Sequence, residues 1–280
     1  MNRLFREQIR SILATWDFRI VCAVIITIML ALAIASANTL HGWEIGPESF
    51  INAFGWSRYG LFLKVFKAGD FIFPVACSLA VGASFAIDRK TRVAQYILTR
   101  GFRKWQYLLA KGAAMMLCSM LLIVLVQGVT WIASTALAHY PTVQPFEAAG
   151  MGGSSQGNLE NLLFHRTPGR YVLMIALLQL LAAGAIATAP LLIAVLGGNA
   201  WTVVITPIVL WFLSGTIFNG NALMFLYPGF RTSAFWWWRP FAAENTPCPP
   251  FLRSSLAYWA ILLLFNAGFA ALVYLRQEDA

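Results

Sequence analysis

The chain has 280 residues, of which 59% are hydrophobic and only 11% are charged, and its mean hydropathy is +0.69. Soluble domains are about 45 to 50% apolar and about 25% charged, so this composition excludes an ordinary water-soluble protein and predicts an integral membrane protein. The formal net charge of +9 does not predict nucleic-acid binding, because basic residues in a membrane protein more often mark the loops that remain in the cytoplasm.

Long stretches without an acidic or basic side chain predict the membrane spans. A bilayer core of about 30 Å needs about 20 apolar residues per helix. The uncharged interval 171–230 is too long for one span and is interrupted by Gly197-Gly198-Asn199, so we predict two helices there. The fold class is therefore all-α integral membrane, with six transmembrane helices in a single domain, residues 1–280. The predicted spans are residues 20–38, 69–87, 108–138, 171–196, 201–218 and 254–275.

The segment before the first span, residues 3–17, has the pattern of a helix lying in the membrane interface. Apolar positions at helical spacing are Leu4, Phe5, Ile9, Ile12, Leu13 and Trp16. The remaining face carries Arg3, Arg6, Glu7 and Arg10. A secretory signal peptide is the alternative, because Ala35-Ser36-Ala37 has the small-x-small form of a cleavage site. The long region before the apolar stretch and its acidic residues Glu7 and Asp17 favour the interfacial helix.

Basic residues are unevenly distributed between the two sides that these spans define. The side that holds both termini and residues 88–111 contains 12 of the 20 Lys and Arg residues, although its segments are much shorter in total. The positive-inside rule therefore predicts that both termini and the 88–111 loop lie in the cytoplasm.

On the opposite side, the segment 219–253 combines apolar residues with backbone interruptions. It contains the run Trp236-Trp237-Trp238 and the prolines Pro247, Pro249 and Pro250. Interrupted backbone at membrane depth is tolerated where it is buried in protein or lines a cavity, which favours a re-entrant or interfacial hairpin. An aromatic belt that anchors the last span is an equally good interpretation.

The 88–111 loop is the only sizeable predicted cytoplasmic loop, and it has an amphipathic order. Val93, Tyr96 and Ile97 can share one helical face, charged and amide side chains occupy the other, and Gly101 permits a turn. We predict a short cytoplasmic helix between spans two and three. The alternative is a purely topogenic loop that only holds this face inside.

At this loop the sequence resembles the ABC-2 family of transporter permeases, the transmembrane subunits of bacterial ABC exporters. The matching positions are Asp88, Tyr96-Ile97-Leu98, Gly101, Arg103-Lys104 and Lys111. The sequence departs from the family where Thr91-Arg92 replaces the usual Gly-Thr, and it lacks the proline common at the turn. The resemblance implies six spans, an N-terminal interfacial helix and a coupling helix that docks into a cytoplasmic ABC ATPase subunit. The residues it implies for this contact are Asp88, Arg89, Arg92, Gln95, Tyr96, Leu98, Arg103 and Lys104.

The resemblance also implies a transport subunit that is not itself an enzyme. A second permease subunit, identical or paralogous, is expected as partner within the membrane lipid, with ATP and Mg²⁺ bound by the ATPase. No phosphate-binding motif of the form G-x-x-x-x-G-K-[ST] occurs in the sequence, which fits a separate ATPase. We predict no cofactor, metal or catalytic site in this chain, because the three histidines are widely separated and lie in outer segments.

Polar and aromatic residues within or near the predicted spans are candidates for lining a transport pathway: Gln127, Trp131, Gln179, Trp211 and Asn266. Hydrogen bonding to a neighbouring helix is the alternative for the amides, because membrane helices commonly use amides in this way. Gly82, Gly128, Gly184 and Gly268 are predicted to allow close helix packing. The competing functions are a six-span secondary carrier or channel without an ATPase, and a membrane-embedded enzyme.

Overall fold

The computed structural model describes residues 2–41, 56–143, 166–218, 226–232 and 251–276. In these ranges the structure is helical, apart from an isolated bridge between Ser57 and Tyr140. Six helices of the described ranges are long and apolar enough to cross a membrane. They cover Trp16–Asn38, Ile72–Lys90, Lys104–Leu137, Pro168–Val195, Ala200–Phe218 and Ser254–Arg276. The predicted all-helical fold class with six apolar spans is confirmed.

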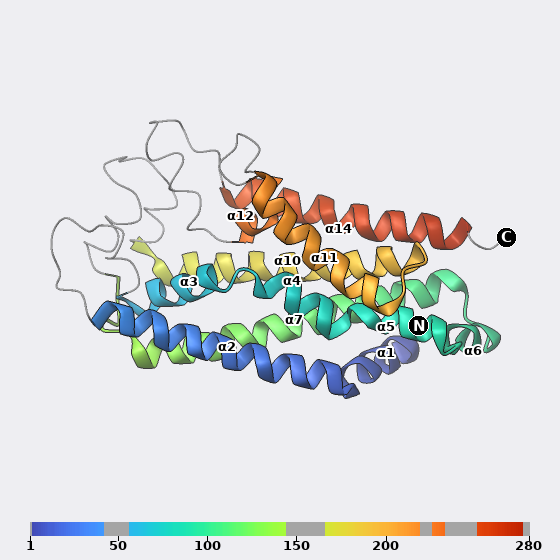
Figure 1. Ribbon diagram of the computed structural model, residues 1–280, viewed down its shortest axis with the longest axis horizontal. Coiled ribbons are helices and arrows are strands. Elements are labelled where there is room, and N and C mark those ends of the chain that lie inside the picture. Colours follow the sequence, from blue (N-terminus) through green and yellow to red (C-terminus); the bar gives the residue numbers. More distant parts are fainter. Residues whose placement is uncertain (1, 42–55, 144–165, 219–225, 233–250, 277–280) are drawn as a thin grey trace.

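The helices follow one another along the chain with short connections in the described ranges (Figure 1). The first half comprises α1 (Asn2–Ala14), α2 (Trp16–His41), α3 (Arg58–Ala68), α4 (Ile72–Cys77), the π-helix η1 (Ser78–Gly82), α5 (Ala83–Lys90), α6 (Val93–Thr99) and α7 (Lys104–Leu137). The second half comprises α10 (Pro168–Val195), α11 (Ala200–Phe218), α12 (Pro228–Thr232) and α14 (Phe251–Arg276).

The bundle is organised around α7 and α10, which pack against each other and contact most of the other helices. Helices α1 and α2 pack on α7, whereas α14 and α11 pack on α10, so the two pairs lie on opposite flanks (Figure 1). The flanking helices keep large apolar side chains exposed, including Val24 on α2, Leu213 on α11 and Leu264 on α14. These outward faces fit contact with lipid chains.

The N-terminal segment forms two helices where one helix over residues 3–17 was predicted. Helix α1 ends at Ala14, and the side chain of Thr15 accepts a hydrogen bond from the backbone N–H of Phe18 at 3.3 Å, which caps the start of α2. Trp16 therefore belongs to α2 and is exposed, so its assignment to the apolar face of the first helix was wrong. That face, with Leu4 and Ile12, is buried in contact with α7.

The second span is not one continuous α-helix. It runs through α4, η1 and α5, and α3 precedes it at a turn that includes Gly69. The π-helical segment packs against α10, where a Cβ on Gly82 would lie 3.3 Å from the Cβ of Pro190. An i→i+5 segment inside a span is uncommon and often marks a point of bending or function.

Part of the predicted outer segment 219–253 is present as α12 and the first turn of α14. The run Trp236-Trp237-Trp238 and the prolines at 247, 249 and 250 lie outside the described residues.

Candidate functional site

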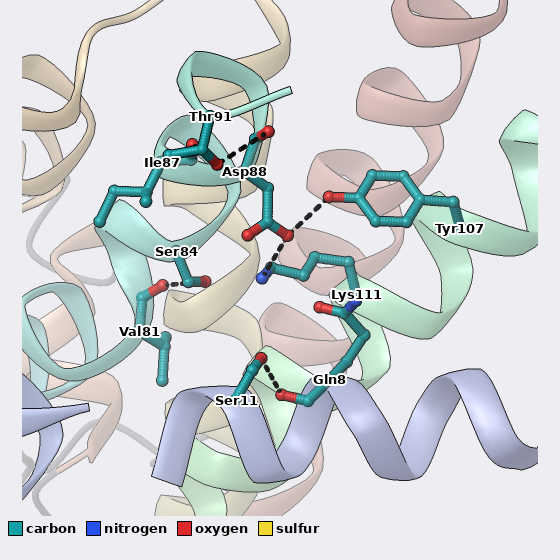
Figure 2. A network of polar contacts seen from close by, with 9 residues as sticks. All are labelled: Gln8, Ser11, Val81, Ser84, Ile87, Asp88, Thr91, Tyr107 and Lys111. Atoms are coloured by element: carbon teal, nitrogen blue, oxygen red, sulfur yellow. Dashed lines mark hydrogen bonds and ion pairs between the residues drawn. The ribbon is translucent and has the colours of Figure 1, made fainter. Parts of the chain in front are cut away.

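The candidate site is the elbow, defined as residues 88–111, where the chain leaves α5, forms α6 and enters α7. Tyr107 and Lys111 are four residues apart on α7, so both face the same side of the helix. The Asp88 Oδ2 atom accepts hydrogen bonds from the Tyr107 hydroxyl and from Lys111 Nζ, each at 2.7 Å (Figure 2). These bonds fasten the end of α5 to the beginning of α7.

The Asp88–Lys111 ion pair is almost completely removed from solvent. Its side chains are 16% and 1% exposed, respectively. A buried ammonium group is costly unless a counter-ion compensates it, so Lys111 depends on Asp88. Figure 2 shows the side-chain amide of Gln8, on α1, pointing toward Lys111. Gln8 is buried as well, so α1 covers the Asp88–Lys111 pair on the side opposite α5.

Helix α6 packs on the bundle through part of its surface and leaves the rest exposed. Ala94 is buried and Ile97 packs against the core, whereas Val93 and Tyr96 are 38% and 57% exposed. Of the three residues predicted to share one helical face, Ile97 therefore contacts the bundle, and Val93 and Tyr96 are exposed. The turn before the helix contains Arg92, whose backbone is left-handed (φ 59°).

The turn after α6 follows the prediction. Gly101 has a φ of +86°, a conformation that glycine adopts without a steric penalty. Helix α7 then begins after Arg103, whose backbone N–H donates to Gln106 Oε1 at 3.0 Å. The elbow is thus a short helix between two tight turns.

The other residues expected at the coupling contact also belong to the elbow. Arg89 Nη1 donates to the carbonyl oxygen of Ala194 on α10 at 2.7 Å, so it joins α5 to a third helix. Arg92, Gln95 and Arg103 are exposed. Leu98 and Lys104 are half-buried.

Two of the candidate pathway residues are brought together in the interior. Gln127 Nε2, on α7, donates to Gln179 Oε1 at 3.0 Å and to the carbonyl of Ala176 at 3.1 Å, both on α10. Gln179 Nε2 in turn lies 3.4 Å from the carbonyl of Thr232 in α12. Both glutamines are buried, so their amides link helices in the way that the alternative interpretation described.

The remaining pathway candidates lie in separate surroundings. Asn266, on α14, donates to the carbonyl of Ala185 on α10 at 3.4 Å. Trp131 packs against Tyr59 and Phe62 of α3, with ring centroids 5.4 and 5.7 Å apart. Trp211 is buried and contacts Tyr227 edge-on at 6.1 Å.

No protein-family model matches the sequence, and no curated protein matches it. Function therefore has to be inferred from the elbow and from its connections to the spans.

The described residues contain no group of three or more His, Cys, Asp or Glu side chains placed to hold a metal ion. His139 instead packs against Trp56, with ring centroids 4.9 Å apart.

Tyr107 and Lys111 were missed as site residues. Lys111 was noted only as a position that matches the family, and Tyr107 was not considered. The sequence does contain a signal for this pair: a phenol and a basic residue at positions i and i+4 face the same side of a helix and can share an acidic partner. Their partner Asp88 lies 19 and 23 residues away in the sequence, which spacing alone does not reveal.

Proposed function

We propose that this chain is the membrane-spanning permease subunit of an ABC-type exporter, driven by a separate cytoplasmic ATPase. The chain pairs with a second permease subunit, identical or paralogous, to enclose the translocation pathway. ATP and Mg²⁺ bind to the ATPase. The elbow faces the cytoplasm, and the protein resides in the cell inner (plasma) membrane.

The observation that carries this proposal is the exposed face of α6. Tyr96 and Val93 stand out from the end of the bundle, and Arg92, Gln95 and Arg100 around them are exposed as well. Aromatic and arginine side chains are enriched at protein interfaces. A solvated topogenic loop has no need of an exposed aromatic face, whereas a docking helix does.

Movement of α6 can be transmitted because the elbow is fastened to three spans. The Asp88–Lys111 and Asp88–Tyr107 bonds join α5 to α7, and the Arg89 bond joins α5 to α10. A force on α6 therefore acts on all three helices together rather than bending one loop. Rigid-body movement of this kind is a common way to couple distant sites.

The spans also contain places where bending requires little energy. The π-helical segment η1 interrupts the second span immediately before α5. Pro190 and Pro207 lie inside α10 and α11, respectively. A proline removes one backbone hydrogen bond within a helix, so the helix bends more easily there. Helix α5 can thus act as a short lever between the elbow and η1.

The experiment tests both the ATPase partner and the docking face. The tagged full-length chain is purified in mild detergent from membranes of cells that produce it naturally, and Mg²⁺-dependent ATP hydrolysis of the complex is measured. Charge reversal at Arg92 and Arg103 together should lower hydrolysis by at least about tenfold, because both exposed cations flank the docking helix.

The matched control reverses two exposed cations of α1 instead, Arg6 and Arg10, at the same end of the bundle. This variant should keep its ATPase activity. Transport by the purified chain alone in proteoliposomes, with no nucleotide, would contradict the proposal and favour a secondary carrier or channel. Unchanged hydrolysis in the Arg92/Arg103 variant would show that α6 is not the coupling contact.

A further inference from the structure

A cavity of about 580 Å³ opens between the end of α5 and the turn that joins α10 to α11. Its lining includes Arg89, Lys90, Gly198, Asn199 and Trp201. The α5 end and this turn lie at the same end of the bundle as α1 and α6 (Figure 1). Neither the Asp88 network nor the exposed face of α6 lines this cavity.

The lining of this cavity is electropositive. Arg89 is held at the wall by its bond to the Ala194 carbonyl, and Lys90 is exposed beside it. The nearest carboxylate in sequence, Asp88, is already engaged by Lys111 and Tyr107, so it is directed toward α7. Among the described residues, neither Arg89 nor Lys90 forms an ion pair, so two adjacent cations face the cavity.

The backbone adds donors to the same wall. The Thr202 N–H is bonded to Asn199 Oδ1 at 2.9 Å, which caps α11. The amides of Ala200 and Trp201 belong to the first turn of this helix, where the backbone offers no intrahelical acceptor. Donors of this kind beside two basic side chains suit an oxygen-rich anion such as a phosphate group.

An apolar stripe leads away from the cavity along α11. Trp201 is 76% exposed, and Ile205 and Val209, one and two turns further along the span, are exposed as well. Positions four residues apart lie on the same face of a helix, so these side chains form one continuous line into the bilayer. A tryptophan at the start of such a line is typical of the headgroup zone.

We propose that this cavity binds the phosphate of an anionic lipid headgroup, with an acyl chain lying along Trp201, Ile205 and Val209. The two cations and the first-turn amides hold the phosphate, and the apolar stripe holds the chain. A free phosphate shares the first set of contacts but not the second. Basic pockets between membrane helices on the cytoplasmic side commonly receive such headgroups.

The test uses the purified full-length chain in dodecyl maltoside, and it does not depend on an ATPase. Phosphatidylglycerol, phosphatidylcholine and inorganic phosphate are titrated separately, and the thermal unfolding midpoint is followed. A ligand that binds the folded state raises this midpoint. Phosphatidylglycerol should raise the midpoint more than phosphatidylcholine, and inorganic phosphate should have little effect.

Lys90→Ala should weaken the apparent affinity for phosphatidylglycerol by about fivefold, because one cation near a membrane surface contributes on that scale. Arg10→Ala removes an exposed cation at the same end but outside the cavity, and should bind the lipid as the natural chain does. Equal effects of the two lipids, or an unchanged affinity of Lys90→Ala, would overturn the proposal. Inorganic phosphate as effective as the lipid would overturn the lipid assignment.

Discussion

At the scale of single residues, the elbow depends on one buried cation. Lys111 has a 1% exposed side chain near the start of a span, and its ammonium group is bonded to Asp88 at 2.7 Å. Removing one partner of a buried pair leaves an uncompensated charge, whereas removing both leaves only a neutral gap. The exposed pair Arg3–Glu7 on α1, at 3.2 Å, offers a contrast because water solvates both groups.

We expect Asp88→Asn to lower the free energy of unfolding by about 3 kcal/mol, because the buried Lys111 amine then lacks the carboxylate that compensates it. The double variant Asp88→Asn/Lys111→Met should recover most of this loss. Glu7→Gln, the control, should change stability by no more than about 0.5 kcal/mol. Unfolding in mixed micelles titrated with sodium dodecyl sulfate measures all three. A double variant as unstable as Asp88→Asn would show that the ion pair is not the source of the loss.

At the scale of elements, the interrupted second span is held in place by close contact with α10. Gly82, the last residue of η1, lies against Pro190 of α10. The regular α-helical hydrogen bonding is interrupted at this point in both helices, by the π-helix in the second span and by the proline in α10. Gly184 likewise lies against Met120 of α7. Gly128 and Gly268 have no neighbour within 4 Å of a notional Cβ and are exposed, so their expected role in close packing was wrong.

We expect Gly82→Leu to lower the free energy of unfolding by about 2 kcal/mol, since its side chain would force α10 away from the second span. Gly268→Leu is the matched control: the same change on an exposed face of α14 should be almost neutral. The same detergent titration compares the two. Equal losses from both variants would indicate a general intolerance of leucine in the spans rather than a contact between η1 and α10.

At the scale of the whole molecule, the elbow, helix α1 and the end of α14 lie at one end of the bundle (Figure 1). Most of the basic residues in the described ranges lie at this end, so the positive-inside rule predicts that it faces the cytoplasm. Thr142, after the other end of α7, then faces the outside. The proposed ATPase contact requires this orientation, and so does a lipid from the cytoplasmic leaflet.

Single cysteines test this orientation in a background in which the four native cysteines are replaced by alanine. A membrane-impermeant maleimide applied to intact cells should label Thr142→Cys. Arg92→Cys and Arg276→Cys should react only after the membrane is permeabilised. Labelling of Arg92→Cys in intact cells would place the elbow outside and contradict the coupling proposal.

The order of residues along the chain is enough to predict the all-helical fold and the approximate limits of the six spans. The reason is that lipid requires long uncharged segments whose backbone groups are satisfied within a helix. It also determined the short helix between spans two and three and the turn at Gly101, because both depend on local backbone preferences.

Which residues contact one another depends on how the helices pack. Asp88 meets Lys111 across 23 residues, and Gln127 meets Gln179 across 52, so local patterns do not contain these contacts. The exposure of Tyr96 depends on how α6 packs against the bundle, and the contact of Gly82 depends on where α10 passes. Hydropathy predicts that a residue lies in the membrane, but the residue that it contacts depends on how the helices pack.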